Sequence, residues 1–497
     1  MIYKTKPYTI RIILVCIFIL ILSLSYVIGR FVFFVIAPII VIIFINTLVR
    51  RNDLFGILMA LYICVHFPYM IRTGGFFTYV AFVIALWAFF KSKNLRTFYK
   101  LKLPSFPKLF LIILLTSSVI GWFLYFSGSV LDLILSVLSF LGIISLFILA
   151  SNIEWNNWRF KVFFNINLVL ILYSLLVSAN AYLRIIPVNL PLFPIYAEEW
   201  IDELLTEGRL EAGGIIGNSP MYGEHSMIMA MFFSIILITK KLRQNLDISF
   251  PWALIGFIAS ILNVFFSISR SIFLLCIFGL ILIWLFNIMF NLKTVLLKPG
   301  RIITFAIALY IIIRVAEGLG LGFVFQRLDQ IDFKNITLKS IQSGESINRA
   351  TAFYYGQQRL NSRNWLIGYG YGLEKNNRIA WFIDPDIERA SPHSQYFAIL
   401  FIFGWFGAIA YFGLIVYLII VLSKKIRKQK HRSDYFQPMA LFFIVAFILF
   451  LISEYTKDAI AVASYFTVTM IWLGLGYSLL KKENTFMGNY SNSKVIY

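Results

Sequence analysis

A histidine at the start of an apolar segment is the clearest candidate for chemistry in this sequence. His393 lies in the polar stretch SPHS at 391–394, which leads directly into a long apolar segment carrying Gly404 and Gly407. An imidazole titrates at a pKa of about 6.5, so it can accept or release a proton near neutral pH. We therefore expect His393 to act as a catalytic group. A histidine that only hydrogen-bonds the backbone at a helix start is the simpler alternative.

Four arginines have neighbours that suit anion binding. Arg209 precedes the glycine-rich turn GGIIGNSP, whose backbone N–H groups could approach an anion closely. Arg270 stands in a serine-flanked turn between two apolar segments, where it could also extend toward lipid headgroups. Arg349 lies on the apolar face of a predicted helix, and Arg359 follows it before the stretch GYGYG at 368–372, which we expect to be flexible. Because guanidinium groups bind phosphate oxygens bidentately, these residues predict a site for a phosphate or diphosphate.

Two further ionisable residues follow the glycine-rich turn. Glu224 and His225 stand at the start of an apolar segment, where ionisable groups are site candidates by default, and we expect them to help bind the substrate. The three cysteines, Cys16, Cys64 and Cys276, lie inside apolar segments and are interpreted as small core residues. No combination of acidic residues and histidine has metal-ligand spacing, so we predict neither a metal nor a cofactor.

The composition is that of an integral membrane protein. Hydrophobic residues make up 60% of the 497 residues and the mean hydropathy is +0.83, well above soluble domains. The 18% aromatic content suggests interfacial belts and lipid-facing surfaces. The net charge of +21 is concentrated in short tracts between apolar segments, which is the positive-inside pattern. It therefore does not indicate nucleic-acid binding.

The apolar segments predict an all-α, polytopic helical bundle with about 14 transmembrane helices. We expect these near 10–28, 31–48, 54–71, 76–90, 109–127, 130–150, 162–186, 219–239, 251–268, 271–290, 302–317, 395–422, 438–454 and 459–480. With both termini in the cytoplasm, every basic tract falls on the cytoplasmic side.

This topology divides the chain into three regions. Residues 1–186 form N-terminal transmembrane helices, and residues 423–497 form C-terminal helices and a cytoplasmic tail. Residues 187–422 form a catalytic core whose outer loops, 187–218 and 318–394, contain helices and most of the candidate site residues.

Four features between residues 205 and 422 resemble the O-antigen polymerase and O-antigen ligase superfamily of bacterial inner membranes. They are GGIIGNSP after Arg209, the Ser-Arg-Ser turn at 269–271, the Arg349 helix followed by LIGYGYG, and PHSQYFAILFIFGWFGAIAYF from Pro392. The spacing of Arg359 and Gly370 is also similar to a pattern of the polymerases. The chain departs from the family in having Asn-Ser-Pro and His-Ser where ligases often have Asn-Pro-Asn and His-Asn.

The resemblance implies a GT-C-like fold and metal-independent glycosyl transfer, with inversion, on the periplasmic side of the inner membrane. It implies that Arg209, Arg270 and Arg349 bind the undecaprenyl diphosphate of the donor, while His393 assists the acceptor hydroxyl or the diphosphate. Both the glycan donor and the acceptor would be linked to undecaprenyl diphosphate, and a chain-length regulator is a possible protein partner.

Three activities fit these features. A polymerase, which we favour, would extend a surface polysaccharide by en bloc transfer of repeat units, whereas a ligase would transfer the glycan to lipid A core. A transporter or flippase for the same lipid-linked glycan belongs to another class. It would have ionisable residues deep in the membrane and paired, broken helices, whereas the polar residues here gather on one side.

Overall fold

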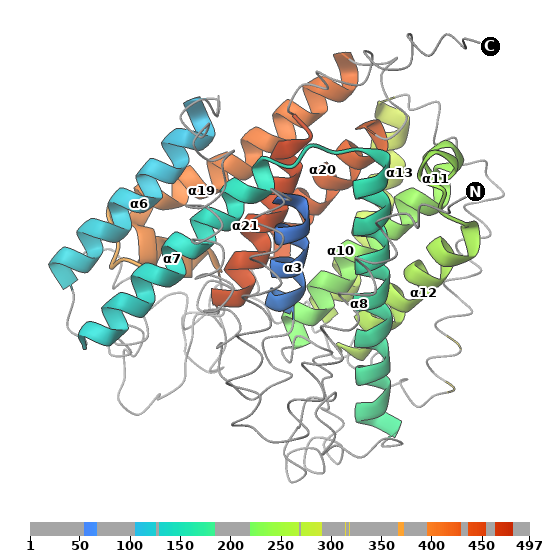
Figure 1. The fold of residues 1–497 in the computed structure, drawn as a ribbon, viewed down its shortest axis with the longest axis horizontal. Helices are drawn as coiled ribbons and strands as arrows, with labels where there is room; N and C mark the ends of the chain where they lie inside the picture. Colours follow the sequence, from blue (N-terminus) through green and yellow to red (C-terminus); the bar gives the residue numbers. More distant parts are fainter. Residues whose placement is uncertain are drawn as a thin grey trace, which may run out of the picture.

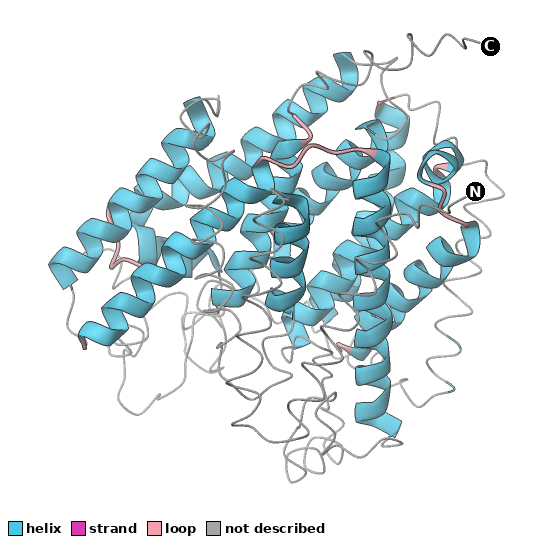
Figure 2. Ribbon diagram, in the orientation of Figure 1, coloured by secondary structure: helices cyan, strands magenta, loops and turns pink. Residues whose placement is uncertain are grey.

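The computed structural model describes residues 54–66, 105–125, 129–183, 219–267, 270–290, 314, 318, 366–371, 395–428, 436–453 and 463–480. Within these ranges the chain forms helices and short loops, without strands (Figure 2). The helices are α3 (Leu54–His66), α6 (Ser105–Tyr125), α7 (Val130–Ser151), α8 (Asn157–Leu183), α10 (Ser219–Ile238), α11 (Lys240–Leu246), α12 (Phe250–Phe266), α13 (Arg270–Met289), α19 (Gln395–Lys428), α20 (Phe436–Ser453) and α21 (Ala463–Ser478).

The bundle is arranged around α10, whose residues from 222 to 236 are all buried. This helix packs against α8, α12, α13 and α20. A second group of helices lies beside this one, with α21 packed against α7 and α3, and α19 packed against α6 and α20 (Figure 1). A helix that is apolar nearly all round has no face suited to water, so it lies in a protein core or against lipid.

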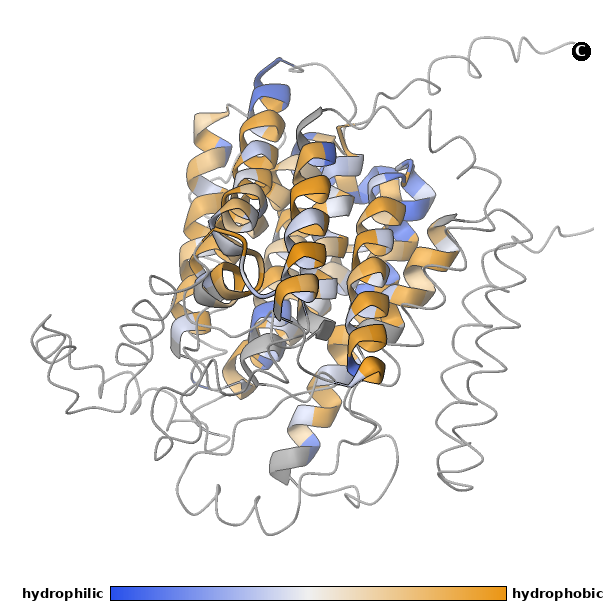
Figure 3. Cartoon of the chain, turned by 90° about the vertical axis from the view of Figure 1, so that its left-hand side faces the viewer, coloured by the Kyte–Doolittle hydropathy of each residue, from blue (hydrophilic) through white to orange (hydrophobic). Residues whose placement is uncertain are grey.

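The described helices confirm a polytopic helical membrane protein. Six of them are long and apolar enough to cross a bilayer, and α10 with α11, bent by 94° at their junction, would make a seventh. Apolar residues occupy the middle of the helices, while hydrophilic ones gather at helix ends (Figure 3). The predicted spans near 10–28, 31–48 and 76–90 lie outside the described residues, and of the span near 302–317 the structure describes residue 314 alone.

Two helices at the side of the bundle carry exposed apolar stripes. Their exposed large side chains recur every three or four residues, as expected for one face of an α-helix in contact with lipid. The stripe of α6 consists of Leu109, Ile112, Leu115, Val119 and Phe123, and that of α13 consists of Leu274, Phe278, Ile281, Leu285 and Ile288.

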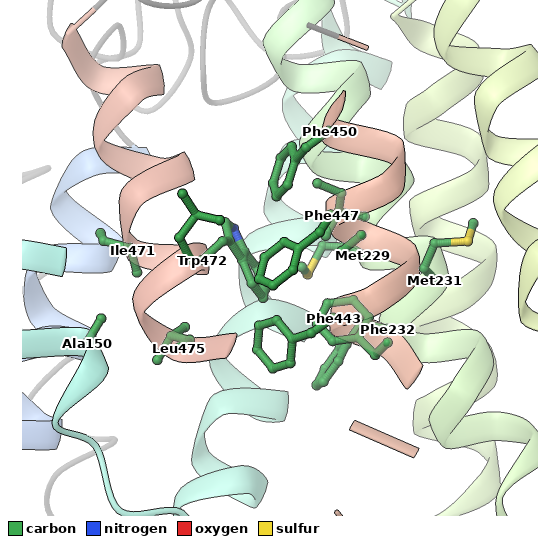
Figure 4. Packing of buried hydrophobic residues seen from close by; sticks show 14 of the residues in the cluster. Ala150, Met229, Met231, Phe232, Phe443, Phe447, Phe450, Ile471, Trp472 and Leu475 are labelled. Carbon is green, nitrogen blue, oxygen red and sulfur yellow. The ribbon is translucent and has the colours of Figure 1, made fainter. Parts of the chain in front are cut away.

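Many aromatic side chains lie in the core and not at the bilayer surface, which differs from the expectation for the aromatic content. Trp472 of α21 is buried against α8 and α20, with its ring 5.6 Å from those of Phe163 and Phe442 in edge-to-face geometry. Phe443 lies 6.0 Å from the same indole (Figure 4). Helix interfaces inside a membrane gain little from the hydrophobic effect, so close aromatic packing is one source of their stability.

The predicted helix near 395–422 is longer than expected and is broken. The segment runs from Gln395 to Lys428, but Gly404 has φ 64° and ψ −172°, which interrupts the helix. A positive φ of this kind is readily available only to glycine.

Candidate functional site

The structure describes three of the predicted site residues. Arg209, Arg349, Arg359 and His393 lie outside the described residues, and for Arg270 the structure describes the backbone, which begins α13. Glu224 and His225 lie near the start of α10 and are 1% and 5% exposed. Burial of two ionisable side chains inside a membrane protein is costly, so both residues stay candidates for a functional site.

Glycine 223 brings the start of α10 against the connection between α12 and α13. A Cβ atom at Gly223 would lie 2.5 Å from the hydroxyl of Ser267 and 3.3 Å from Cγ2 of Ile272. Arg270 stands between these two residues in the chain. The structure therefore brings the backbone of Arg270 and the Glu224–His225 pair to the same end of the bundle, as the sequence predicts.

Glu224 joins α10 to the end of α20. The hydroxyl of Ser453 donates a hydrogen bond to Oε1 of Glu224 and also lies 3.2 Å from the carbonyl of Phe450. Ser453 is completely buried. A hydrogen bond to a buried carboxylate offsets part of the free energy lost when the carboxylate leaves water.

A second polar group includes Tyr222, two residues before Glu224 on α10, and joins three helices. Ser178 of α8 donates to the hydroxyl of Tyr222, 2.7 Å away, and that hydroxyl donates to Oδ1 of Asn263 in α12. The amide of Asn263 donates to the carbonyl of Ile171, 2.9 Å away. Sequence reasoning did not select these residues, although the asparagine inside the apolar run ILNVFF was a signal that could have identified Asn263 as one member.

The GYGYG stretch, expected to be flexible, is held firmly where it is described. Residues 366–371 lie against the break in α19, in the loop drawn beside α6 and α19 in Figure 2. Gly368 and Gly370 are buried with φ values of 76° and 91°. The sequence suggested flexibility because glycine can adopt many conformations. In the structure both glycines instead adopt a positive φ, which other residues rarely reach.

Backbone hydrogen bonds link this segment to α19. The N–H groups of Tyr369 and Gly370 donate to the carbonyls of Phe401 and Ile402, both at 2.8 Å. The N–H of Phe406 donates to the carbonyl of Leu366 at 3.3 Å. In an unbroken helix the carbonyl of residue 402 would accept from the N–H of residue 406. The segment thus satisfies backbone groups that the break at Gly404 would otherwise leave unpaired within the membrane.

Close contacts on the other side lock the same segment to α6. The indole N–H of Trp122 donates to the carbonyl of Tyr371, 2.7 Å away. A Cβ on Gly121 would overlap the backbone of Tyr369 and Gly370, so only glycine fits there. Two of the features behind the family resemblance, LIGYGYG and the glycines of α19, are therefore parts of one structural unit.

The described residues contain no group of three or more histidine, cysteine or carboxylate side chains that could hold a metal ion. Cys276 is buried in α13, as predicted for a small core residue. Comparisons with family models and with curated proteins find no match for this chain.

Proposed function

We propose that this protein is a membrane glycosyltransferase of the O-antigen polymerase type. In this proposal it forms a GT-C-like bundle of about 14 transmembrane helices in a bacterial inner membrane. Both termini lie in the cytoplasm and the active site faces the periplasm. The enzyme joins oligosaccharide repeat units carried on undecaprenyl diphosphate, without a metal or cofactor.

The observation that carries this proposal is the close approach of Gly223 to Ser267. It places the second turn of α10 beside the first turn of α13, which Arg270 begins. Helix N-termini favour anions, because their N–H groups lack helical partners and the helix dipole is positive there. Two such ends, together with an arginine, suit a diphosphate at the membrane surface.

In this proposal Glu224 balances the positive charge of the site when no donor is bound. Glu224 is buried near the start of α10, on the helix that approaches Arg270. In this proposal the carboxylate orients the guanidinium of Arg270 and prevents a net excess of positive charge when the donor has left. Arg209, Arg349 and Arg359 complete the diphosphate site.

The reaction is a single displacement at the anomeric carbon. The acceptor hydroxyl oxygen forms the new glycosidic bond as the bond between the anomeric carbon and the diphosphate breaks, which inverts the configuration. His393 takes the proton of the acceptor hydroxyl, and the arginines stabilise the charge that develops on the diphosphate. Loss of one such donor typically lowers the rate by about 10²–10³-fold.

The test uses purified full-length protein with its lipid-diphosphate-linked repeat unit in the presence of EDTA. We expect a ladder of lengthened glycans with the wild type, and none with His393→Ala or Arg270→Ala. Arg270→Lys is the matched variant, since it keeps the charge but loses bidentate geometry and should retain partial activity. Lys241→Ala, on α11, controls for loss of a cation far from the site.

Two other outcomes would each replace this proposal. Glycan that appears on added lipid A core, without chain growth, would identify a ligase. Movement of labelled lipid across the bilayer without any transfer would identify a transporter, a class that the broken helix α19 also fits.

A further inference from the structure

A pocket of about 740 Å³ lies at the other end of the bundle, where α8 begins and α11 leads into α12. Lys161, which lines it, stands in the first turns of α8, whereas Ser178 of the polar group stands near the opposite end of that helix. At 1.5 Å per residue, the two positions are roughly 25 Å apart along the helix axis. The pocket is therefore separate from the proposed diphosphate site.

Three cations line this pocket, and one of them is held in place. The Nη1 atom of Arg243 donates to the carbonyls of Ile236, at 3.1 Å, and Leu237. Its guanidinium carbon lies 5.2 Å from the centre of the Phe250 ring. The bend of 94° between α10 and α11 brings Arg243 and Lys240 to the pocket wall. A cation fixed in this way loses little entropy when it binds an anion.

The pocket has one acidic residue. Asp247 forms an ion pair with Lys161 at 2.5 Å, and the two side chains are 92% and 37% exposed. Exposed ion pairs of this kind contribute little to stability, so an anion in the pocket can compete with Asp247 for Lys161. Lys161, Lys240 and Arg243 leave a positive excess over this single carboxylate.

One rim of the pocket is apolar and exposed. Phe250 and Trp252 line the pocket and are 51% and 53% exposed, and Ile255 continues the same exposed face at 38%. Trp residues beside cations are typical of the membrane–water interface, where a ring contacts both headgroups and acyl chains. A ligand that matches both the cationic lining and the apolar rim has an anionic head and an apolar chain.

We propose that this pocket binds an anionic phospholipid. Its phosphate contacts Lys161, Lys240 and Arg243, and its acyl chains follow Trp252 and Ile255 along α12. Basic pockets between transmembrane helices recognise phosphate-bearing headgroups by this combination of charge and shape. The inference does not depend on the proposed glycosyl transfer.

Native mass spectrometry of the full-length protein in detergent tests this inference by titration with phosphatidylglycerol or phosphatidylcholine. We expect the wild type to retain phosphatidylglycerol preferentially. Lys240→Gln should weaken that binding about fivefold, the effect of one cation near a lipid phosphate. Lys241→Gln removes the same charge from the same helix outside the pocket lining and should leave binding within about twofold.

Asp247→Asn provides a change in the opposite direction. Asp247 has a left-handed backbone, with φ 51° and ψ 47°, which asparagine adopts as readily. Removal of the carboxylate frees Lys161 for the lipid phosphate, so this variant should bind phosphatidylglycerol about two- to fivefold more tightly. A gain of binding cannot result from misfolding.

Three results would overturn the inference. They are equal retention of the two lipids by the wild type, equal loss in the Lys240→Gln and Lys241→Gln variants, and weaker binding by Asp247→Asn. A further arm adds inorganic phosphate alone. If phosphate binds with the same dependence on Lys240 while the lipids are not distinguished, the pocket takes a free anion and the lipid assignment is wrong.

Discussion

Gly121 of α6 lies directly against Gly370, with no room for a side chain between the two backbones. The contact joins α6 to the segment that supplies hydrogen-bond partners for the backbone of the broken helix α19. Because both partners are backbone atoms, neither can move aside as the end of a flexible side chain could. The fit depends on glycine at both positions.

We predict that Gly121→Ala and Gly404→Ala each destabilise the protein by at least 2 kcal/mol, about the cost of backbone strain or core overpacking. A Cβ at Gly404 would overlap the carbonyl of Leu366, and its φ of 64° is unfavourable for alanine. Thermal unfolding in detergent measures the change. Gly318→Ala is the matched control, since a Cβ there meets no atom within 4 Å. Equal melting temperatures for all three variants would contradict the described packing.

A second prediction concerns the approach of α10 to the α12–α13 connection. Gly223→Ala places a methyl group 2.5 Å from the Ser267 hydroxyl, so we expect it to displace the start of α13. The rate of glycosyl transfer should fall by tenfold or more, since a small misplacement of reacting groups can cost about 10²-fold. Ser267→Gly removes the obstructing side chain. The double variant should therefore recover activity, and failure to recover would show that Gly223 acts in another way.

The Tyr222 hydroxyl gives a third prediction. Tyr222→Phe removes the group that connects Ser178 with Asn263, and we expect it to destabilise the bundle by about 0.5–2 kcal/mol. Unfolding by SDS measures this free energy. In a double-mutant cycle with Asn263→Ala, the two losses should be less than additive, because each substitution removes the same hydrogen bond. Additive losses would mean that the two side chains do not interact.

The fourth prediction separates the charge of Glu224 from its hydrogen bond. Glu224→Gln retains an oxygen that can accept from Ser453, so the variant should fold normally. If the carboxylate orients Arg270, transfer should fall by about tenfold or more, which corresponds to roughly 1.4 kcal/mol of transition-state stabilisation. Ser453→Ala supplies the comparison, since it keeps the charge and removes the donor. Full activity of Glu224→Gln would exclude a role for the charge.

A fifth prediction tests the topology with single cysteines in a cysteine-free background. Ser129 and Lys241 are both exposed at helix ends. The positive-inside pattern predicts that Lys241 faces the cytoplasm and that Ser129 faces the opposite side of the membrane. A membrane-impermeant thiol reagent applied to intact cells should label Ser129→Cys but not Lys241→Cys, and the reverse pattern would invert the topology.

The sequence predicted the positions of the described helices well, because bilayer thickness imposes a length on every apolar run. The segments expected near 130–150 and 438–454 match α7 and α20 closely. It also indicated that Glu224, His225 and Arg270 would lie at one end of the bundle. That inference required only helix order and direction, which hydropathy supplies.

The hydrogen-bonding of the broken helix could not be predicted in this way. Hydropathy treats the run from Gln395 to Lys428 as one span, and a glycine within it can as easily pack against a neighbour as interrupt the helix. The deciding partners, Leu366 to Gly370, lie far earlier in the chain. Likewise, the residues that share the Tyr222 hydroxyl come from three helices, and no local pattern in the sequence connects them.

The attachment of residues 366–371 to α19 also fixes where the stretch 372–394 begins and ends. Both ends of that stretch are held by the same broken helix. The contacts of residues 366–371 with α19 therefore already offset the entropy lost when the two ends are brought together. Doubling the length of such a loop costs only about 0.6 kcal/mol. Insertions between these two anchored ends should therefore cost the bundle little stability.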